Sequence, residues 1–358
     1  MRRIVGIVLA VLLIGGVAAA VVAGRDSEET GTATKTVRMV IGSEKAAFFA
    51  DPDVVEALAA QGYTVEAETS GSWAMEGLDL DGYDLAFPSS RAPAAELAQK
   101  HGVRGILPRP FYSPLVVVSR RGAAEVLAAN GLATPAGRTP GTLKMAAYLD
   151  AARRDRTWQQ LKGAERYGEL TGTLFISSTD PQTSNSGALY LAAASYVANG
   201  GKVVASDAEV ERTAPLMRTL VSVQGAQQSS TDAAFRDFVS GAGNPLVLVY
   251  ESQVAALLDE QQNADDLVVL YPDTTVNSDH TVVPLTDDGR KLAELLGSDP
   301  TLRKLAVRHG FRPQGAITEF TAATVGRTAY LKQQLTGVRQ APVPTSAVLR
   351  ELARRARG

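Results

Sequence analysis

Apolar and polar residues follow one another in blocks along this chain, and the block at residues 178–191 is the most informative. An apolar, β-branched run at residues 173–176 precedes it and indicates a buried strand. A run rich in Ala, Leu and Tyr at residues 188–197 follows without internal Gly or Pro, which favours a helix. The pattern therefore predicts a strand, a polar turn and a helix.

The turn carries residues suited to a helix start. Ser184, Asn185 and Ser186 are good N-cap residues, and Gly187 lets the backbone come close to whatever faces it. A helix start has unpaired N–H groups and about half a positive charge, so hydroxyls there can hold an anion without Lys or Arg. An ordinary capped helix is the alternative, and this turn alone does not separate the two.

Three earlier segments repeat the arrangement. Predicted strands at residues 37–41, 63–68 and 83–87 each run into a turn that contains serine. The serines of these turns are Ser43, Ser70, Ser72, Ser89 and Ser90. Strands that alternate with helices imply a mainly parallel sheet, in which ligands lie beyond the carboxyl ends of the strands. Any one serine is commonly a cap or turn residue, but the recurrence favours a binding site.

Two further apolar runs divide the chain. Residues 114–119 form a predicted buried strand that leads away from the first group of strands, and residues 245–250 form a second one that leads back. Helical patterns fill much of the segment between them. Since 358 residues exceed what one core usually holds, we expect two lobes joined by a two-strand hinge.

Composition excludes several kinds of protein. A hydrophobic fraction of 45% and a charged fraction of 21% are those of a globular protein, and a net charge of -2 gives no reason to expect nucleic acid. The absence of Cys excludes disulfides, thiolate metal sites, a Cys nucleophile and a lipid-modified cysteine. The three His are widely separated, so we expect neither a metal site nor a cofactor.

The N-terminus suggests a location. Arg2 and Arg3 precede an uncharged stretch at residues 4–24, which is long enough, at about 1.5 Å per residue, to cross a bilayer. Residues 1–24 are therefore a signal-anchor or a cleaved signal peptide, and residues 25–35 a flexible tether. Because the positive end stays inside, we expect the body on the extracytoplasmic face of the cell membrane, or secreted after cleavage.

Several of these segments together resemble a known family. The segments are IGSEKAAFF near Ile41, TSGSW at Thr69, YDLAFPSS at Tyr83, PLVVVSR at Pro114, STDPQTSNSG, LVLVYESQ at Leu246, LVVLYPD at Leu267 and LRKLAVRHGFRP at Leu302. Their order is similar to that of the type II periplasmic, or extracellular, solute-binding proteins, nearest to the molybdate, tungstate and sulfate binders. The resemblance covers about residues 36–313, and STDPQTSNSG and VYESQ are its more specific parts.

The resemblance implies an α/β fold of two lobes that close over a small ligand, most simply an oxyanion, for an ABC permease. Lobe 1 would comprise residues 36–115 and 250–340, and lobe 2 residues 116–249. A basic tail would follow at residues 341–358, and the protein would be a monomer. Carried over by position, the ligand-binding residues are Ser43, Ser70, Ser72, Ser89, Ser184, Asn185, Ser186, Gly187 and Tyr250.

Two acidic residues depart from this pattern. Glu44 follows Ser43, and Glu251 follows Tyr250. A carboxylate beside a fully ionised oxyanion costs energy by like-charge repulsion, so an inward-pointing Glu would require a ligand with a proton to donate or a positive group. Phosphate at neutral pH carries such a proton, whereas molybdate and sulfate do not. Alternatively, both side chains point to solvent or cap neighbouring N–H groups.

Other functions stay open. A Ser hydrolase would need a base near a serine, but there is no G-x-S-x-G elbow, and His101, His280 and His309 do not obviously meet a Ser loop, so we expect no enzyme. The ligand could instead be organic or zwitterionic, and the partner a membrane or stress-response protein rather than a permease. The basic helix at residues 346–357 is expected to be solvated, with contact to anionic lipid or a partner as the alternative.

Overall fold

The computed structural model describes residues 34–358 except 261–263 and 265, and residues 35–358 form one compact unit. The predicted signal or anchor at residues 1–24 and nearly all of the tether lie outside the described residues. Within the described part of the chain, no helix has the length and apolar character needed to cross a bilayer.

The first sheet has the predicted parallel arrangement. Its strands, in the order β10-β3-β1-β2, are β1 (Lys35–Ile41), β2 (Tyr63–Thr69), β3 (Leu85–Phe87) and β10 (Val283–Pro284). β1 pairs in parallel with β2 and β3, while β10 is antiparallel to β3. Alternate residues of β1 face opposite sides of the sheet, so Met39 packs with Phe48 on one side and Val40 packs with Leu97 on the other.

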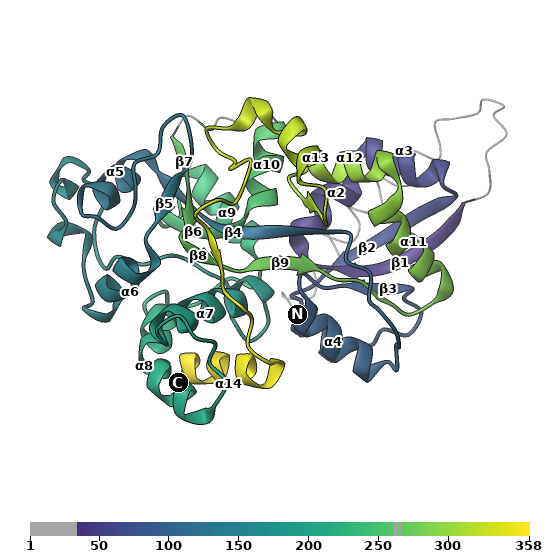
Figure 1. Ribbon diagram of the computed structural model, residues 1–358, viewed down its shortest axis with the longest axis horizontal. Coiled ribbons are helices and arrows are strands. Elements are labelled where there is room, and N and C mark those ends of the chain that lie inside the picture. The colour runs from purple at the N-terminus through teal and green to yellow at the C-terminus, as the bar shows by residue number, and fades with distance from the viewer. Residues whose placement is uncertain (1–33, 261–263, 265) are drawn as a thin grey trace, which may run out of the picture. The chain divides into compact units, whose positions relative to one another are not determined.

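Helices cover both faces of this sheet (Figure 1). They are α2 (Ala46–Ala50), α3 (Pro52–Ala60), α4 (Arg91–Lys100), α11 (Asp287–Ser298) and α12 (Pro300–Arg308), with the short 3-10 helices η1 (Ser43–Lys45) and η2 (Ala74–Gly77). The alternation of strand and helix in this part of the sequence therefore produced the α/β layers that it predicted.

The second sheet is built around one long strand, β4 (Phe111–Arg120). The carboxyl half of β4 pairs with β6 (Leu246–Tyr250) and β7 (Leu267–Pro272), which in turn pairs with β5 (Gly141–Leu143). The amino half pairs with β9 (Asn277–His280) and β11 (Arg312–Pro313). The two-residue strands β8 (Thr274–Thr275) and β12 (Arg339–Gln340) form a separate pair.

The strand that leads back to the first sheet is β9, because β10 follows it. β4 and β9 run antiparallel side by side between the two sheets (Figure 1). The sequence had assigned this return to residues 245–250, but β6 pairs with β4 inside the second sheet. β7 also belongs to the second sheet, although residues 250–340 were expected in lobe 1. β6 and β7 are apolar and buried throughout, whereas β9 is short and polar in sequence, so hydrophobicity did not point to β9 as the strand that crosses.

The remaining helices surround the second sheet and its connections (Figure 1). They are α5 (Arg121–Ala129), α6 (Met145–Arg153), α7 (Asn185–Ala198), α8 (Asp207–Ser222), α9 (Thr231–Ser240), α10 (Glu251–Asp259), α13 (Ile317–Ala323) and α14 (Ser346–Arg357), with η3 (Trp158–Gln160), η4 (Ala164–Arg166) and η5 (Val325–Arg327).

The segment before α7 is not the strand that its sequence predicts. Residues 173–176 form no regular strand, and the segment touches the sheet through one parallel bridge between Ser177 and Val247. Ile176 is buried, and its backbone N–H donates to the hydroxyl of Tyr148 (3.1 Å) rather than to a neighbouring strand. A side chain from α6 thus takes the place of a strand partner, which a local pattern does not encode.

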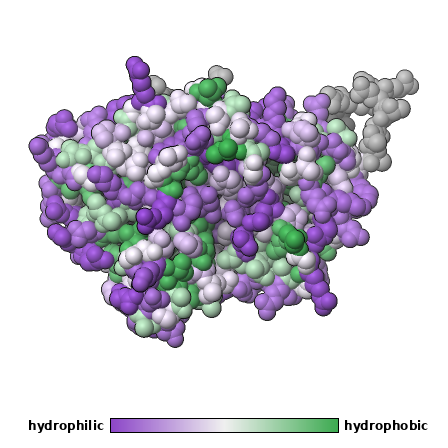
Figure 2. Space-filling model, viewed as in Figure 1, coloured by the Kyte–Doolittle hydropathy of each residue, from purple (hydrophilic) through white to green (hydrophobic). Residues whose placement is uncertain are grey.

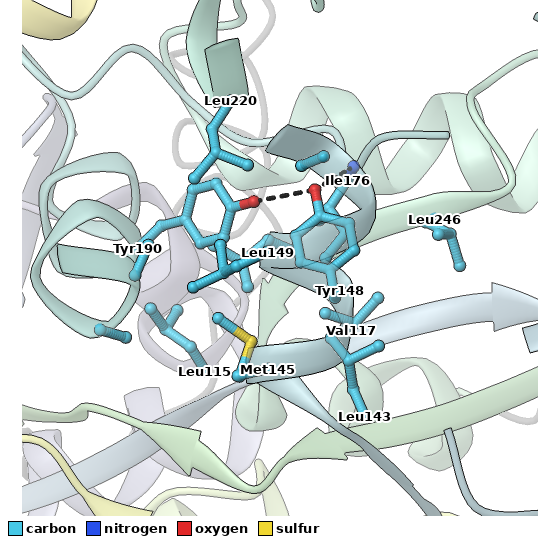
Figure 3. Packing of buried hydrophobic residues seen from close by; sticks show 14 of the residues in the cluster. Leu115, Val117, Leu143, Met145, Tyr148, Leu149, Ile176, Tyr190, Leu220 and Leu246 are labelled. Carbon is cyan, nitrogen blue, oxygen red and sulfur yellow. Dashed lines mark hydrogen bonds between the residues drawn. The ribbon is translucent and has the colours of Figure 1, made fainter. Parts of the chain in front are cut away.

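The core of the second sheet holds α6 and α7 in place (Figure 3). Leu115 and Val117 of β4 pack with Tyr148 of α6 and Tyr190 of α7, and the two tyrosine hydroxyls lie 3.0 Å apart. Both hydroxyls are buried, so this hydrogen bond satisfies groups that water does not reach. The packing fixes the start of α7, where the predicted site lies.

The basic tail is part of the fold and not a solvated helix. In α14, Leu349, Leu352 and Ala356 are buried against α8 and α7. Charged residues on its other faces form ion pairs, such as Arg357 with Asp180 (2.9 Å). On the face that Figure 2 shows, apolar residues appear as separate patches in a mainly hydrophilic surface. The expectation was wrong because the sequence of α14 does not show that α7 and α8 lie against its apolar face.

Candidate functional site

The turns that follow β1, β2 and β3 meet the starts of α7 and α9 and the end of β6 at one small cavity. Because the carboxyl ends of parallel strands share one edge of a sheet, the first three turns had to come together. The cavity is small, with a volume of about 10 Å³. Its lining consists of Gly42, Ser43, Glu44, Ser70, Gly71, Ser72, Ser89, Ser184, Asn185, Ser186, Ser229, Ser230, Thr231 and Tyr250.

All the ligand-binding residues expected from the sequence line this cavity except Gly187. A Cβ atom on Gly187 would lie 2.3 Å from the carbonyl oxygen of Thr179 and 2.9 Å from Cα of Pro181. The glycine therefore lets α7 pack closely against the turn before it, and it does not open the backbone to a ligand. The sequence indicated that something approaches the backbone of Gly187 closely, but not that this neighbour is the turn at Thr179 and Pro181.

The turns after β2 and β3 form one hydrogen-bond chain. The hydroxyl of Ser72 donates to that of Ser89 (3.1 Å), and the backbone N–H of Ser89 donates to Ser72 (2.9 Å). The Ser89 hydroxyl in turn donates to Oε1 of Glu44 (2.7 Å). Ser72 and Ser89 are both buried, so they are held in place on the wall of the cavity.

The opposite wall comes from the start of α7. The hydroxyl of Ser186 lies 3.1 Å from that of Ser184 and 2.7 Å from that of Thr179. The amide of Asn185 donates to the hydroxyls of Tyr250 (3.0 Å) and Ser278 (3.1 Å). Asn185 thereby ties α7 to β6 and β9.

The two walls touch each other. The backbone N–H groups of Trp73 and Ala74 donate to the carbonyl of Thr183 (3.1 and 3.2 Å). A Cβ atom on Gly71 would lie 2.4 Å from the same oxygen, so only glycine allows this contact. The turn after β2 therefore closes directly against the turn before α7.

Several helices begin at the cavity. Gly42, Ser184, Ser230 and Tyr250 line it and are the N-cap residues of η1, α7, α9 and α10. Neither Ser184 nor Ser230 accepts a hydrogen bond from its own helix, whereas Ser206 caps α8 in the usual way. The cavity thus lies at the partially positive ends of helices whose first N–H groups have no intrahelical partner.

The serines before α9 were missed by the sequence reasoning. Ser229, Ser230 and Thr231 line the cavity from a turn that leads into a predicted helix, as the other Ser-containing turns do. The signal is present in the sequence, because residues 231–239 show a helical pattern directly after these serines. No strand precedes this turn, because α8 is the element before α9, so the rule that ligands lie beyond the ends of strands does not point to it.

Glu44 points into the cavity and not to solvent. Its side chain is 4% exposed and is paired with the ammonium of Lys45. That ammonium also lies 3.3 Å from the Ser89 hydroxyl and 4.8 Å from the centre of the Phe87 ring. Burial opposes ionisation of Glu44, but Lys45 and His280 outweigh it and hold the pKa of this carboxyl well below its usual range.

His280 lies beside this pair, contrary to the expectation that no His meets a Ser loop. Its Nδ1 is 3.2 Å from Nζ of Lys45 and 3.3 Å from Oε1 of Glu44. Burial, and then the charge of Lys45, lower the pKa of His280 to about 4, so the ring is neutral at pH 7. The pairing of β9 with β4 puts it there, which is a tertiary effect.

A second carboxylate lies at the edge of the cavity. Asp232, in the first turn of α9, is hydrogen-bonded to Gln253 and Ser43. Burial raises the pKa of Asp232, and the nearby Glu44 charge adds to this effect. Among the described residues, no group of three or more His, Asp or Glu side chains is placed to hold a metal ion.

Glu251 points away from the cavity. Both of its carboxylate oxygens accept hydrogen bonds from Arg312 (2.6 and 2.8 Å), and the hydroxyl of Tyr271 donates to it as well. The Glu251 and Arg312 side chains are both buried. Glu251 therefore joins the start of α10 to β11 of the second sheet and plays no direct part in the site.

Comparison with known proteins identifies the fold. No protein-family model and no curated protein matches the chain. A solved structure of the sulfate-binding protein SubI from Mycobacterium tuberculosis H37Rv matches with a TM-score of 0.51 and 17% identity, over 88% of this chain and 96% of that one. A periplasmic thiamin binding protein matches with a TM-score of 0.57 and 13% identity, over 91% and 97%.

A third solved structure, the periplasmic binding protein AfuA from Actinobacillus pleuropneumoniae with fructose-6-phosphate bound, matches with a TM-score of 0.56 and 12% identity, over 90% and 97% of the chains. Sequence identities this low establish a similar fold but not a shared ligand or function. The fold resemblance drawn from the sequence is confirmed. This chain has the fold of the type II periplasmic solute-binding proteins.

Proposed function

We propose that this protein is an extracytoplasmic solute-binding protein that captures a small oxyanion between two lobes and delivers it to an ABC permease. The observation that carries the proposal is the serine-lined cavity at the starts of α7 and α9, where Ser184 and Ser230 do not cap their own helices. Hydroxyls and backbone N–H groups at helix starts are the donors that hold an oxyanion by dipoles.

The cavity offers many donors and little net charge. Lys45 is the ammonium nearest to it, and this group is already paired with Glu44. An oxyanion would therefore be held mainly by hydroxyls such as those of Ser72 and Ser186 and by the helix starts. Among the solved structures of the same fold, one is a sulfate-binding protein, which is consistent with this ligand class.

The contact between the two walls points to a closed arrangement of the site. The walls that carry the serines touch each other at this small cavity, so we infer that they separate when a ligand enters or leaves. β4 and β9 are the two strands that run between the sheets, and the contact of the Gly71 turn with Thr183 joins the two walls of the cavity. We infer that the lobes open by bending at β4 and β9 and that this contact breaks.

The location and partner follow from the N-terminal segment. Residues 1–24 would hold the body at the outer face of the membrane, or would be removed on secretion. A body held there could pass its ligand to a permease in the same membrane, and it would act as a monomer without a cofactor.

A thermal-shift experiment tests the ligand class. The full chain is heated with molybdate, tungstate, sulfate or phosphate, and a ligand at a hundredfold excess over its dissociation constant should add about 2.7 kcal/mol of stability. If none of these anions raises the melting temperature while an amino acid or a polyamine does, the oxyanion assignment is wrong.

Small-angle scattering tests the motion. With a confirmed ligand at saturation, the radius of gyration should fall, because the lobes close around it. An unchanged radius would contradict the clamshell mechanism while leaving the ligand assignment intact.

A further inference from the structure

Glu44 places a negative charge where an oxyanion would bind. A Cβ atom on Gly42 would lie 2.7 Å from each carboxylate oxygen of Glu44, so the side chain folds back over the backbone at the start of η1. Its Oε1 accepts the hydrogen bond of the Ser89 hydroxyl (2.7 Å), which is one of the donors in the lining. A ligand in this cavity must therefore lie beside a buried carboxylate.

Two carboxyl groups and one ammonium lie around the cavity. Glu44 faces it, Asp232 borders it with a pKa that burial raises, Lys45 is already paired with Glu44, and His280 has no charge at pH 7. Arg236 is on the same helix as Asp232 but is exposed. A ligand would thus lie near two carboxyl groups and one ammonium that is already paired, although the helix starts favour an anion.

An anion that carries a proton fits both the buried carboxylate and the helix starts. A fully ionised dianion next to Glu44 is repelled in a place from which water is excluded. An anion with an acidic hydroxyl can donate it to the carboxylate, which replaces the repulsion by a charge-assisted hydrogen bond. Its remaining oxygens still accept from the serines and the helix starts.

We propose that Glu44 makes this site selective for oxyanions that carry a proton to donate, with hydrogen phosphate as the simplest example, over fully ionised ones such as sulfate and molybdate. The proposal rests on the oxyanion-binding function proposed above and names its ligand class. Oε1 of Glu44 already accepts from Ser89 and pairs with Lys45, so Oε2 is the oxygen that would accept the proton of the ligand. A site built to accept a hydrogen bond strongly rejects an analogue that has no hydrogen there, because that acceptor is then left unpaired.

Calorimetric titration at pH 7 tests this selectivity. The full chain is titrated with inorganic phosphate and with sulfate, and phosphate should bind at least about a hundredfold more tightly. In Glu44→Gln, the amide can donate to sulfate, so the ratio of the two affinities should fall at least about tenfold. In Asp232→Asn, the neighbouring charge is removed and both affinities should rise, with the ratio retained.

The outcomes separate this inference from the proposed function. Wild-type protein that binds sulfate as tightly as phosphate overturns the selectivity and leaves the oxyanion function standing. A ratio that collapses in Asp232→Asn and persists in Glu44→Gln overturns the role of Glu44. If neither phosphate nor sulfate nor molybdate binds, the oxyanion function fails, and this inference fails with it.

A second variant keeps the test possible if Glu44→Gln does not fold. Glu44→Gln leaves Lys45 buried without its partner, which is costly. If that variant does not fold, the double variant Glu44→Gln/Lys45→Met removes both members of the pair, a change that is commonly tolerated. It too should lose the preference for phosphate over sulfate, and a preference kept at the wild-type level would contradict the proposal.

Discussion

The hydroxyls of Ser184 and Ser186 lie 3.1 Å apart at the start of α7, and the Ser184 side chain does not cap that helix. The hydroxyls are turned toward each other on the cavity wall instead. The sequence left two interpretations of this turn open, an ordinary helix cap and an anion site. They can be told apart by experiment, because a capping serine contributes to stability whereas a ligand-binding serine contributes to affinity.

We therefore predict that Ser184→Ala changes the free energy of unfolding by less than about 0.5 kcal/mol, since no cap is lost. Its oxyanion affinity should fall about tenfold or more, because one donor is removed. The matched control is Ser206→Ala on α8, where the side chain accepts a hydrogen bond from the backbone N–H of Glu209. That variant should lose about 1 kcal/mol of stability with unchanged affinity. Denaturant unfolding and calorimetry on both variants measure the two quantities, and the reverse pattern would identify Ser184 as a cap.

Substitution of Gly187 should affect stability first. In Gly187→Ala the new Cβ would lie 2.3 Å from the Thr179 carbonyl oxygen, so α7 and the preceding turn must move apart. We expect a loss of about 1–3 kcal/mol in chemical denaturation. Gly77→Ala is the control, because its Cβ would meet no atom within 4 Å. Equal stabilities of the two variants would contradict the close approach.

The buried pair of Glu251 and Arg312 should be a determinant of stability. Glu251→Gln leaves the guanidinium of Arg312 buried without its counter-charge, and a loss of about 3–5 kcal/mol is expected. The double variant Glu251→Leu/Arg312→Met should lose less, because no unpaired charge is left behind. Folded Glu251→Gln protein should keep its ligand affinity, and a selective loss of affinity would place Glu251 in the site after all.

Stability should depend on the protonation of His280. In the unfolded chain its pKa is about 6.5, and in the folded protein it is about 4, so the unfolded state binds more protons between these values. Stability is therefore complete above pH 6.5 and falls as the pH drops toward 4, by roughly 3 kcal/mol in all.

Urea unfolding between pH 6.5 and 4.5 measures this loss. Carboxylates with lowered pKa values, such as Asp51 at about 2, respond mainly below their unfolded value of 3.8 and contribute little in this window. In His280→Gln the stability should vary less with pH over the same range. An identical slope in the two proteins would show that His280 is not the titrating group.

The C-terminal helix should stabilise the whole unit. Leu352 is fully buried between α14 and its neighbours, so Leu352→Ala should cost about 2–5 kcal/mol. Arg354→Ala, on the exposed side of the same helix, should stay within about 0.5 kcal/mol. If both variants unfold at the wild-type denaturant concentration, α14 does not contribute to the folded unit in solution.

The sequence by itself predicted most of the local structure and the composition of the cavity. The strands β1, β2 and β3, the Ser-containing turns after them and the start of α7 follow from short-range patterns of apolar and capping residues. Since the carboxyl ends of parallel strands meet at one edge, the serines of separate turns could also be predicted to lie together. These features depend on near neighbours in the chain or on a general rule of sheet geometry.

The tertiary structure decided the details on which selectivity depends. Glu44 points inward because its carboxylate contacts the Lys45 ammonium and the His280 ring there. His280 is 235 residues away from Lys45 in the chain. The neighbour of Gly187 and the burial of α14 likewise depend on which surfaces meet after folding. An apolar period shows that a face will be buried but not against what, and a charged residue points to whichever partner the fold provides.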